Sequence, residues 1–365
     1  MREETPENRQ KLRSGYSTGA CATATSLAAA DLLLNDRVSE SATITLPRGQ
    51  QVAFKLERCE RISQGRTMAS TIKDAGDDPD ATHLATVFAE VELVENPGIR
   101  FYAAEGVGTV TRAGLSIPVG EPAINPVPRK MMTEHLVDLG NQSGYAGGFA
   151  VHIGIVNGAK IALDTMNGRL GILGGLSILG TTGIVRPYSC SAFIASIHQS
   201  IDVAHANGVS HIAAATGSTS ETHIQARLAL PDMAVVEMGD FAGAVLKHLR
   251  KVPMKRLSIC GGFGKISKLA TGHHSLHSKD SAIDFGFLGE VAEKLGADHA
   301  LVRRILKSNT SLEALEYCQS ENIPMANAIC ALARTTASKA CKHRCEIDVY
   351  AIDRSGQDVG TSLET

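Results

Sequence analysis

The sequence contains no tryptophan, and aromatic residues make up only 4% of its 365 positions. Proteins that hold single-stranded nucleic acid usually stack the bases on a series of aromatic rings, and no such series is present. Basic residues are not in excess either, because 36 Lys and Arg face 38 Asp and Glu. No polybasic block can follow a phosphate backbone. We therefore expect no nucleic-acid partner, and a large planar ligand would be held mainly by aliphatic and polar groups.

Long apolar runs are also missing. The first 13 residues are charged and polar and lack the apolar core of a secretory signal, and no apolar run reaches membrane-spanning length. These absences predict a cytoplasmic protein without membrane association. The eight cysteines are scattered and suggest reduced, buried thiols rather than a disulfide framework. A homo-oligomer is compatible with the sequence, which does not set the number of subunits.

A chain of this length exceeds the size at which a single core usually stops growing, so we expect two domains, residues 1–165 and 166–365. The first is predicted to be α+β, with two helices, three strands that are probably antiparallel, and a hairpin across Asn157-Gly158. The helices are expected at 19–34 and 129–139, the strands at 41–46, 51–56 and 86–94, and the hairpin arms at 149–156 and 160–164.

The second domain alternates helical segments with short apolar strands, which predicts a Rossmann-like α/β domain with a mainly parallel sheet. The expected strands are 211–215, 234–237 and 257–260, the expected helices include 192–206 and 325–339, and a hairpin is expected around Ser355-Gly356. A single continuous sheet through both domains would contradict this division.

Three of these strands end in polar or glycine-rich turns, at the edge where open α/β sheets bind ligands. A ribose or carboxylate would fit the first turn, and the carboxylate of Glu237 is suited to ribose hydroxyls. The alternatives are an ordinary helix cap and a glycine turn that only allows close packing. The predicted nucleotide-binding residues of this edge are Gly217, Ser218, Thr219, Ser220, Glu237, Gly261, Gly262 and Gly264.

The segment 170–186 holds five glycines and is therefore a poor helix. Thr181, Thr182 and Gly183 are candidates for wrapping a ligand closely, with Arg186 nearby for a carboxylate. The alternative is a segment that crosses between domains and packs its backbone tightly.

Three clusters raise the question of a metal. Residues 73–80 concentrate four carboxylates, but their spacing is not that of an EF-hand, and turns explain most of it. The other two clusters do not form a recognised four-ligand zinc pattern. They are His273, His274 and His277, and Cys341, His343 and Cys345. We therefore assign no metal ligand.

Several long motifs, in the same order along nearly the whole chain, resemble the cobalt-precorrin-5B C(1)-methyltransferase family, CbiD. They are residues 12–22, 73–80, 106–111, 122–129, 169–185, 217–221 and 264–265. The resemblance implies transfer of a methyl group from S-adenosylmethionine to C-1 of cobalt-precorrin-5B, giving cobalt-precorrin-6A and S-adenosylhomocysteine in anaerobic cobalamin biosynthesis. It also suggests that the first domain is similar to the second domain of ribosomal protein S5.

A corrin precursor carries acetate and propionate groups, which arginine side chains can clamp bidentately between two domains. Together with the resemblance, this chemistry assigns the substrate to the first domain and the methyl donor to the second. Thr181, Thr182 and Gly183 are predicted to bind the methyl donor as well. The predicted substrate-binding residues are Thr18, Gly19, Asp74, Asn125, Arg129, Arg169 and Arg186.

Methyl transfer from a sulfonium needs alignment rather than a covalent intermediate, so no nucleophile is nominated. His83 or an aspartate of the 74–80 loop, Asp78 among them, is the candidate base. Two rival functions remain: a nicotinamide-dependent oxidoreductase that uses the same Rossmann-like edge, and a tetrapyrrole carrier without activity. Titration with S-adenosylhomocysteine and NADH distinguishes the oxidoreductase from the methyltransferase. A test for turnover distinguishes the carrier from an enzyme.

Overall fold

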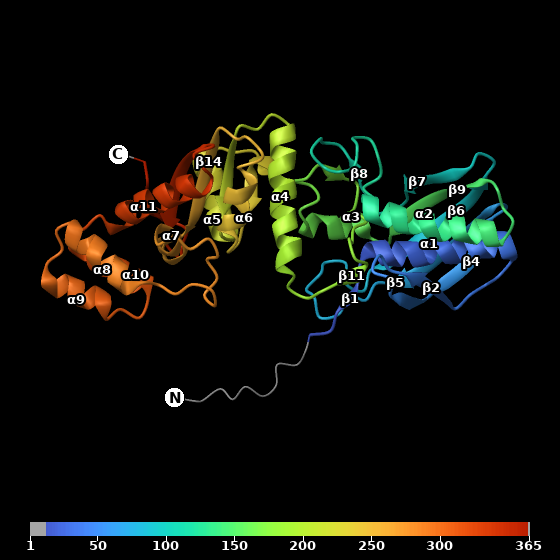
Figure 1. Ribbon diagram of the computed structural model, residues 1–365, viewed down its shortest axis with the longest axis horizontal. Coiled ribbons are helices and arrows are strands. Elements are labelled where there is room, and N and C mark those ends of the chain that lie inside the picture. Colours follow the sequence, from blue (N-terminus) through green and yellow to red (C-terminus); the bar gives the residue numbers. More distant parts are fainter. Residues whose placement is uncertain (1–11, 364–365) are drawn as a thin grey trace. The chain divides into compact units, whose positions relative to one another are not determined.

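The computed structural model describes residues 12–363, and the chain divides into two compact units, Met1–Cys190 and Ser191–Thr365 (Figure 1). The division falls later than the predicted boundary at residue 165. Residues 166–190 lie with the first unit because two of their strands pair there: β10 (Ile172–Leu173) with β8 (Thr109–Val110), and β11 (Ile184–Val185) with β1 (Gly15–Tyr16). This segment is rich in glycine and has no hydrophobic periodicity, so its sequence did not indicate that it pairs with β1 and β8.

The first unit is built on a five-stranded sheet in the order β4-β5-β6-β9-β7. All neighbours are antiparallel except β7 and β9. The strands are β4 (Arg58–Ser63), β5 (Arg66–Ile72), β6 (Thr86–Val94), β7 (Gly98–Ala103) and β9 (Gly148–Ile155). A separate antiparallel hairpin joins β2 (Ser41–Thr45) to β3 (Gln51–Lys55). The predictions for β2, β3 and β6 are confirmed, whereas β4, β5 and β7 were not predicted.

Two helices run side by side along this sheet, α1 (Thr18–Asn35) and α2 (Pro126–Gln142) (Figure 1). Helix α1 packs on β5 and β6, and its alanines are buried, because small side chains let a helix approach a sheet closely. Its start is capped by the Ser17 hydroxyl, which accepts a hydrogen bond from Ala20 N at 3.2 Å. Helix α2 begins earlier than predicted, since prolines are tolerated in a first helical turn.

The hairpin predicted across Asn157-Gly158 is wrong. Both edges of β9 are already occupied, by β6 on one side and β7 on the other. Residues after the turn form the short helix α3 (Gly158–Ile161) and the 3-10 turn η1 (Ala162–Asp164) instead. Asn157 has the left-handed conformation, with φ 58°, and directs the chain into that helix.

The second unit contains a sheet in the order β13-β12-β14-β15-β16, in which only β16 is antiparallel to its neighbour. The prediction of a mainly parallel sheet, separate from that of the first unit, is confirmed, as is the hairpin around Ser355-Gly356. The strands are β12 (His211–Ala215), β13 (Val235–Glu237), β14 (Arg256–Gly262), β15 (Glu346–Ile352) and β16 (Asp358–Thr361).

Eight helices and one 3-10 turn accompany this sheet within residues 190–363. They are α4 (Cys190–Ala206), α5 (Ser218–Leu228), η2 (Asp232–Ala234), α6 (Ala242–His248), α7 (Phe263–Ala270), α8 (Phe285–Lys294), α9 (His299–Leu306), α10 (Ser311–Ser320) and α11 (Met325–Ala340). Helices α8, α9 and α10 lie together, as Figure 1 shows. Over residues 12–363, no helix has the length and apolar character needed to cross a membrane.

Candidate functional site

The strand order of the second unit's sheet reverses between β12 and β14. From β12 the chain moves to one side to form β13, and then returns past β12 to form β14 on the other side. In open α/β sheets such a reversal leaves space for a ligand beyond the strand ends. A Cβ atom added at Gly217 or at Gly262 would meet no atom within 4 Å, so both turns border open space.

The other two glycines predicted here are packed against protein. A Cβ at Gly261 would lie 2.7 Å from the Thr216 side chain, and one at Gly264 would lie 2.7 Å from Ser311 Oγ. For these two positions the close-packing alternative describes the contacts. Gly217 and Gly262 are the pair whose backbone a ligand can approach.

Lys265 fastens the three strand-end turns together. Its Nζ donates to the carbonyl oxygen of Thr216, after β12, at 3.1 Å, and lies 3.0 Å from Asp240 Oδ1, after β13. The lysine itself follows β14, on α7. Its charge is thus balanced by Asp240, and Lys265 acts as a brace for this edge.

The remaining residues predicted at this edge differ in exposure. Glu237 is exposed at the end of β13 and has no ion-pair partner in the part of the chain that the structure describes. Ser220 is buried, and its hydroxyl donates to Gly217 O at 2.8 Å, so it stabilises the turn. Ser218 and Thr219 begin α5, whose start has no side-chain cap. The first amide groups of α5 therefore remain for a ligand.

The structure places Thr181, Thr182 and Gly183 in the first unit. The Thr182 hydroxyl hydrogen-bonds with the backbone of Ile184, and Gly183 O accepts from Ser17 N at 2.9 Å. Gly183 has φ +76°, and a Cβ there would lie 2.6 Å from Leu46. The predicted donor-binding set is therefore divided between two units, and tight backbone packing accounts for this part of it.

Three predicted substrate residues hold the glycine-rich segment against the starts of α1 and α2. The Thr18 hydroxyl donates to Leu179 O and accepts from Leu179 N at 3.0 Å, while Gly19 N donates to Leu179 O at 2.9 Å. Asn125 N donates to Ile178 O at 2.9 Å. The contacts of these residues in the structure are thus with the chain itself.

The guanidinium of Arg129 is engaged by acceptors in its own neighbourhood. Its Nε donates to Ile124 O at 2.9 Å, and Nη2 donates to Pro122 O and Glu121 Oε2, both at 3.1 Å. The backbone carbonyl of Arg169 accepts a hydrogen bond from Arg112 Nη1 at 3.0 Å. Arg186 is exposed and makes no ion pair within residues 12–363. It is the predicted arginine best placed to meet a carboxylate.

We expect Arg129→Lys to lower the free energy of unfolding of the first unit by about 1–2 kcal/mol, because one ammonium cannot replace three guanidinium hydrogen bonds. Urea denaturation measures this, with Arg100→Lys, an exposed arginine on β7, as the control. Unchanged stability with a raised KM for the corrinoid would return Arg129 to the substrate site.

The carboxylates of the 74–80 loop are used by protein donors. Asp74 forms a two-pronged ion pair with Arg13, which with the Gly76 amide lowers the pKa of Asp74 to about 2. Asp77 accepts from Arg13 N at 2.6 Å, and Asp78 Oδ1 accepts from Tyr188 N at 2.9 Å. Lys73, with 1% of its side chain exposed, lies 2.5 Å from Asp80. The loop is thus fixed to segments on both sides of it.

The histidine and cysteine clusters do not converge. Across residues 12–363, no group of three or more His, Cys, Asp or Glu side chains is arranged to hold a metal ion. Cys341 Sγ and Cys345 Sγ lie 3.9 Å apart, and all eight cysteines are free thiols, of which Cys190 is exposed rather than buried.

His83 has a fixed hydrogen-bonding role. Its Nδ1 lies 3.1 Å from the backbone nitrogen of Ala75, and an amide N-H can only donate. Nδ1 is therefore the acceptor, and the neutral ring carries its proton on Nε2. In this arrangement His83 offers a donor at Nε2 and no free base, which leaves Asp78 as the candidate base from the sequence.

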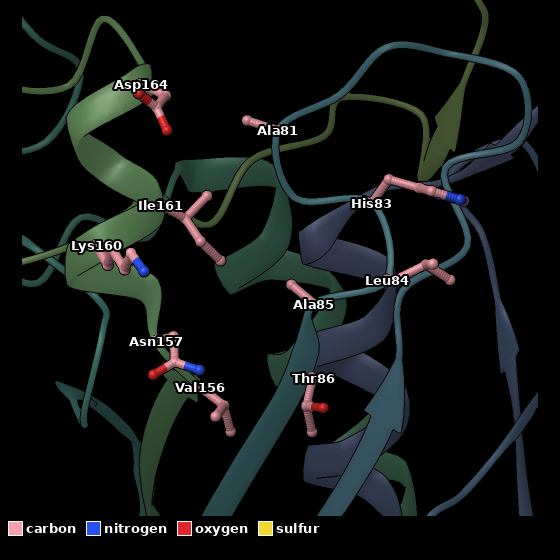
Figure 2. Close-up of a pocket in the computed structure, with 10 residues that line it drawn as sticks. All are labelled: Ala81, His83, Leu84, Ala85, Thr86, Val156, Asn157, Lys160, Ile161 and Asp164. Carbon is pink, nitrogen blue, oxygen red and sulfur yellow. The ribbon is translucent and has the colours of Figure 1, made fainter.

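A cavity of about 660 Å³ lies beside His83 in the first unit (Figure 2). It is lined by the loop before β6, the end of β9 and helix α3. The lining residues are Ala81, His83, Leu84, Ala85, Thr86, Val156, Asn157, Lys160, Ile161 and Asp164. Figure 2 shows the His83 ring directed away from Lys160 and Asp164. The cavity therefore brings aliphatic walls and one lysine together.

Comparison with known proteins identifies the family. A family model described as CbiD matches residues 5–187, and one described as CbiD, C-terminal domain, matches residues 275–362. The chain belongs to the CbiD family. A cobalt-precorrin-5B C(1)-methyltransferase of Burkholderia cenocepacia (strain HI2424) is 58% identical over 99% of this chain and 100% of its own. One of Burkholderia orbicola (strain MC0-3) is 59% identical with the same coverage.

A solved crystal structure is also similar to this CbiD chain. It is described as a cobalamin biosynthesis protein (cbiD) from Archaeoglobus fulgidus and shares 27% sequence identity. The match covers 69% of this chain and 78% of that one, with a TM-score of 0.38.

Of the residues that line the cavity of this CbiD chain, only His83 was predicted from the sequence to be a site residue. Lys160 and Ile161 were assigned to a strand, and the alternation expected of a strand would not have turned both toward one space. Asn157-Gly158 was read as a hairpin turn, although its left-handed asparagine instead starts α3. The helical signal was four residues long, too short for periodicity to reveal.

Proposed function

We propose that this CbiD chain transfers a methyl group from S-adenosylmethionine to C-1 of cobalt-precorrin-5B, forming cobalt-precorrin-6A and S-adenosylhomocysteine. The observation that carries the proposal is the 58% identity, over 99% of the chain, to proteins named cobalt-precorrin-5B C(1)-methyltransferase. The methyl carbon exchanges its bond to the donor sulfur for a bond to the ring carbon. Alignment of those two atoms is the main task of the protein.

The methyl donor is assigned to the turns at the carboxyl ends of β12, β13 and β14, taken as a Rossmann-like nucleotide site. Gly217 and Gly262 border open space there, and Glu237 offers a carboxylate to the ribose hydroxyls. The uncapped amides at the start of α5 suit the carboxylate of the methionine part.

The charges of this edge favour a sulfonium over a dinucleotide. Lys265 is paired with Asp240, and Glu237 has no cationic partner in the described chain, so the turns carry a net negative charge. A sulfonium cation is attracted to such an edge, whereas the pyrophosphate of a nicotinamide cofactor needs a cation or a dedicated glycine turn. This argues against the oxidoreductase.

The corrinoid is assigned to the first unit, where Arg186 is exposed and available for a substrate carboxylate. Asp78 remains the candidate base, and His83 is assigned as a hydrogen-bond donor through Nε2. The likeness of this unit to the second domain of ribosomal protein S5, the cytoplasmic location and a homo-oligomer remain predictions.

The proposal is tested by isothermal titration of the purified chain with S-adenosylhomocysteine and with NADH, followed by mass spectrometry of the corrinoid after incubation with methyl donor. We expect binding of the first compound only, and a corrinoid heavier by one methyl group. Binding of NADH alone would support the oxidoreductase, and corrinoid binding without a mass change would support the carrier.

Glu237→Ala is expected to weaken S-adenosylhomocysteine about tenfold and to leave corrinoid affinity unchanged, because a charge-assisted hydrogen bond to the ribose is lost. Titration of each ligand measures both affinities. Glu293→Ala, an exposed acid on α8, is the control. Equal weakening of both ligands would indicate a folding defect and contradict the ribose assignment.

A further inference from the structure

The cavity beside α3 is held open by backbone contacts rather than by mobile side chains. A Cβ at Gly106 would lie 2.0 Å from Ile155 O, and one at Gly158 would lie 2.3 Å from Gly106 O. These approaches fix the start of α3 against the end of β9. Val156 N also donates to Thr86 O at 3.0 Å, which holds the start of β6 against the end of β9. The space is therefore a built feature of the first unit.

The walls of the cavity are aliphatic and unusually exposed. Val156 is 41% exposed, although it is a large apolar residue. Ile161, from α3, adds a second aliphatic side chain to the lining, whereas Figure 2 shows the Leu84 side chain directed away from α3. Such a surface suits a ligand with methylene groups of its own.

The polar groups lie mainly on one side. Lys160 makes no ion pair within residues 12–363, and Asn157 precedes it on the same side of the cavity (Figure 2). Thr86 adds a hydroxyl from the facing strand. Figure 2 shows Lys160 between Asn157 and Asp164, which is the acid of the lining. An anion would therefore be accepted at the Asn157 end, away from Asp164.

We infer that this cavity receives a carboxylate-bearing side chain of the corrinoid, with its methylenes against Val156 and Ile161 and its carboxylate on Lys160 and Asn157. The inference rests on the proposed function for the identity of the ligand. An acetate or propionate arm has the required combination of a short aliphatic stem and a terminal negative charge. Lys160 is then a specificity residue, which separates side chains that end in carboxylates from those that end in amides.

The test measures binding of two probes by the full chain. One is cobyrinic acid, a cobalt corrinoid whose side chains end in carboxylates, and the other is the same corrinoid with those groups converted to amides. We expect the native chain to prefer the acid. Lys160→Met should weaken the acid about tenfold and leave the amide unchanged, whereas Lys160→Arg should retain most of the preference.

A second variant tests the space itself. Ala81 is exposed, and Figure 2 shows its methyl group directed across the cavity toward Asp164, so Ala81→Trp should narrow the cavity without disturbing the core. Both probes should then bind more weakly. Lys130→Met, on α2, is the matched control, because Lys130 is an exposed lysine of the same unit, 3.6 Å from Glu134.

The inference is overturned if the native chain binds neither probe or does not prefer the acid, if Lys160→Met binds the acid as the native chain does, or if Ala81→Trp leaves both affinities unchanged. Failure of the proposed methyl transfer has a different signature. In that case S-adenosylhomocysteine does not bind and no methyl group is transferred, while Lys160→Met still abolishes the preference for the acid.

Discussion

Lys73→Met is expected to destabilise the first unit by about 3–5 kcal/mol, since removing one member of a buried ion pair leaves the other charge without compensation. Lys73 is 1% exposed and its Nζ lies 2.5 Å from Asp80. Burial alone would raise the pKa of Asp80, but the Lys73 ammonium and the Thr82 donors hold it below its usual value. Chemical denaturation at pH 7 measures the loss, and Lys55→Met, at an exposed lysine on β3, should cost little.

The pH dependence of that loss has a definite sign. In the native chain the lowered pKa of Asp80 contributes stability that is present above the unfolded pKa of about 3.9 and is lost as the pH falls. In Lys73→Met, burial without a cation should raise that pKa, so protonation at low pH relieves the variant. The difference in unfolding free energy should therefore shrink between pH 7 and pH 4. A difference that does not change with pH would contradict the ion-pair explanation.

Gly106→Ala is expected to cost about 3 kcal/mol or more and to raise the KM for the corrinoid. The residue has φ +75°, and a Cβ there would lie 2.0 Å from Ile155 O and 2.8 Å from Gly158 N. Both atoms belong to backbone at the end of β9 and the start of α3, so relieving the overlap requires Gly106 to move away from this backbone or the β9–α3 connection, which leads into Lys160, to shift. Thermal unfolding and steady-state kinetics measure the two effects.

The matched control for this variant is Gly49→Ala. Gly49 also has a positive φ, +85°, but a Cβ there would meet no atom within 4 Å. It therefore carries the conformational penalty of about 1 kcal/mol without the overlap. Equal losses at the two positions would show that backbone conformation, and not the contact with α3, accounts for the effect of Gly106→Ala.

The sequence predicted elements whose signals are local. Strand β6 places Glu90 and Glu92 on one face of an alternating pattern, and α1 follows a capping serine, so both were expected close to their observed bounds. The turns after β12 and β14 were expected at the strand ends because alternation of helices and strands places them there. What remained open was which glycines face space, and that depends on the neighbouring side chains of Thr216 and Ser311.

The rest depends on partners far apart in the chain. The pairing of Arg13 with Asp74 spans 61 positions, and the contact of Thr18 with Leu179 spans 161. The sequence alone does not show that Asp74 and Thr18 have protein partners rather than a ligand. The same limit affected Arg129, whose acceptors are mainly backbone carbonyls and carry no sequence signal. The substrate residues were thus predicted from side-chain types that can bind a carboxylate, and the same side-chain types also make contacts within the protein.

The pairing of β1 with β11 also bears on how the chain folds during synthesis. Gly15 lies opposite Val185, and the 74–80 loop is tied both to Arg13 and to Tyr188. A ribosome that has produced the sheet and both of its helices has not yet produced the segment that completes these ties. The first unit must therefore wait for residues near 188 before residues 13–16 and the 74–80 loop reach their final contacts.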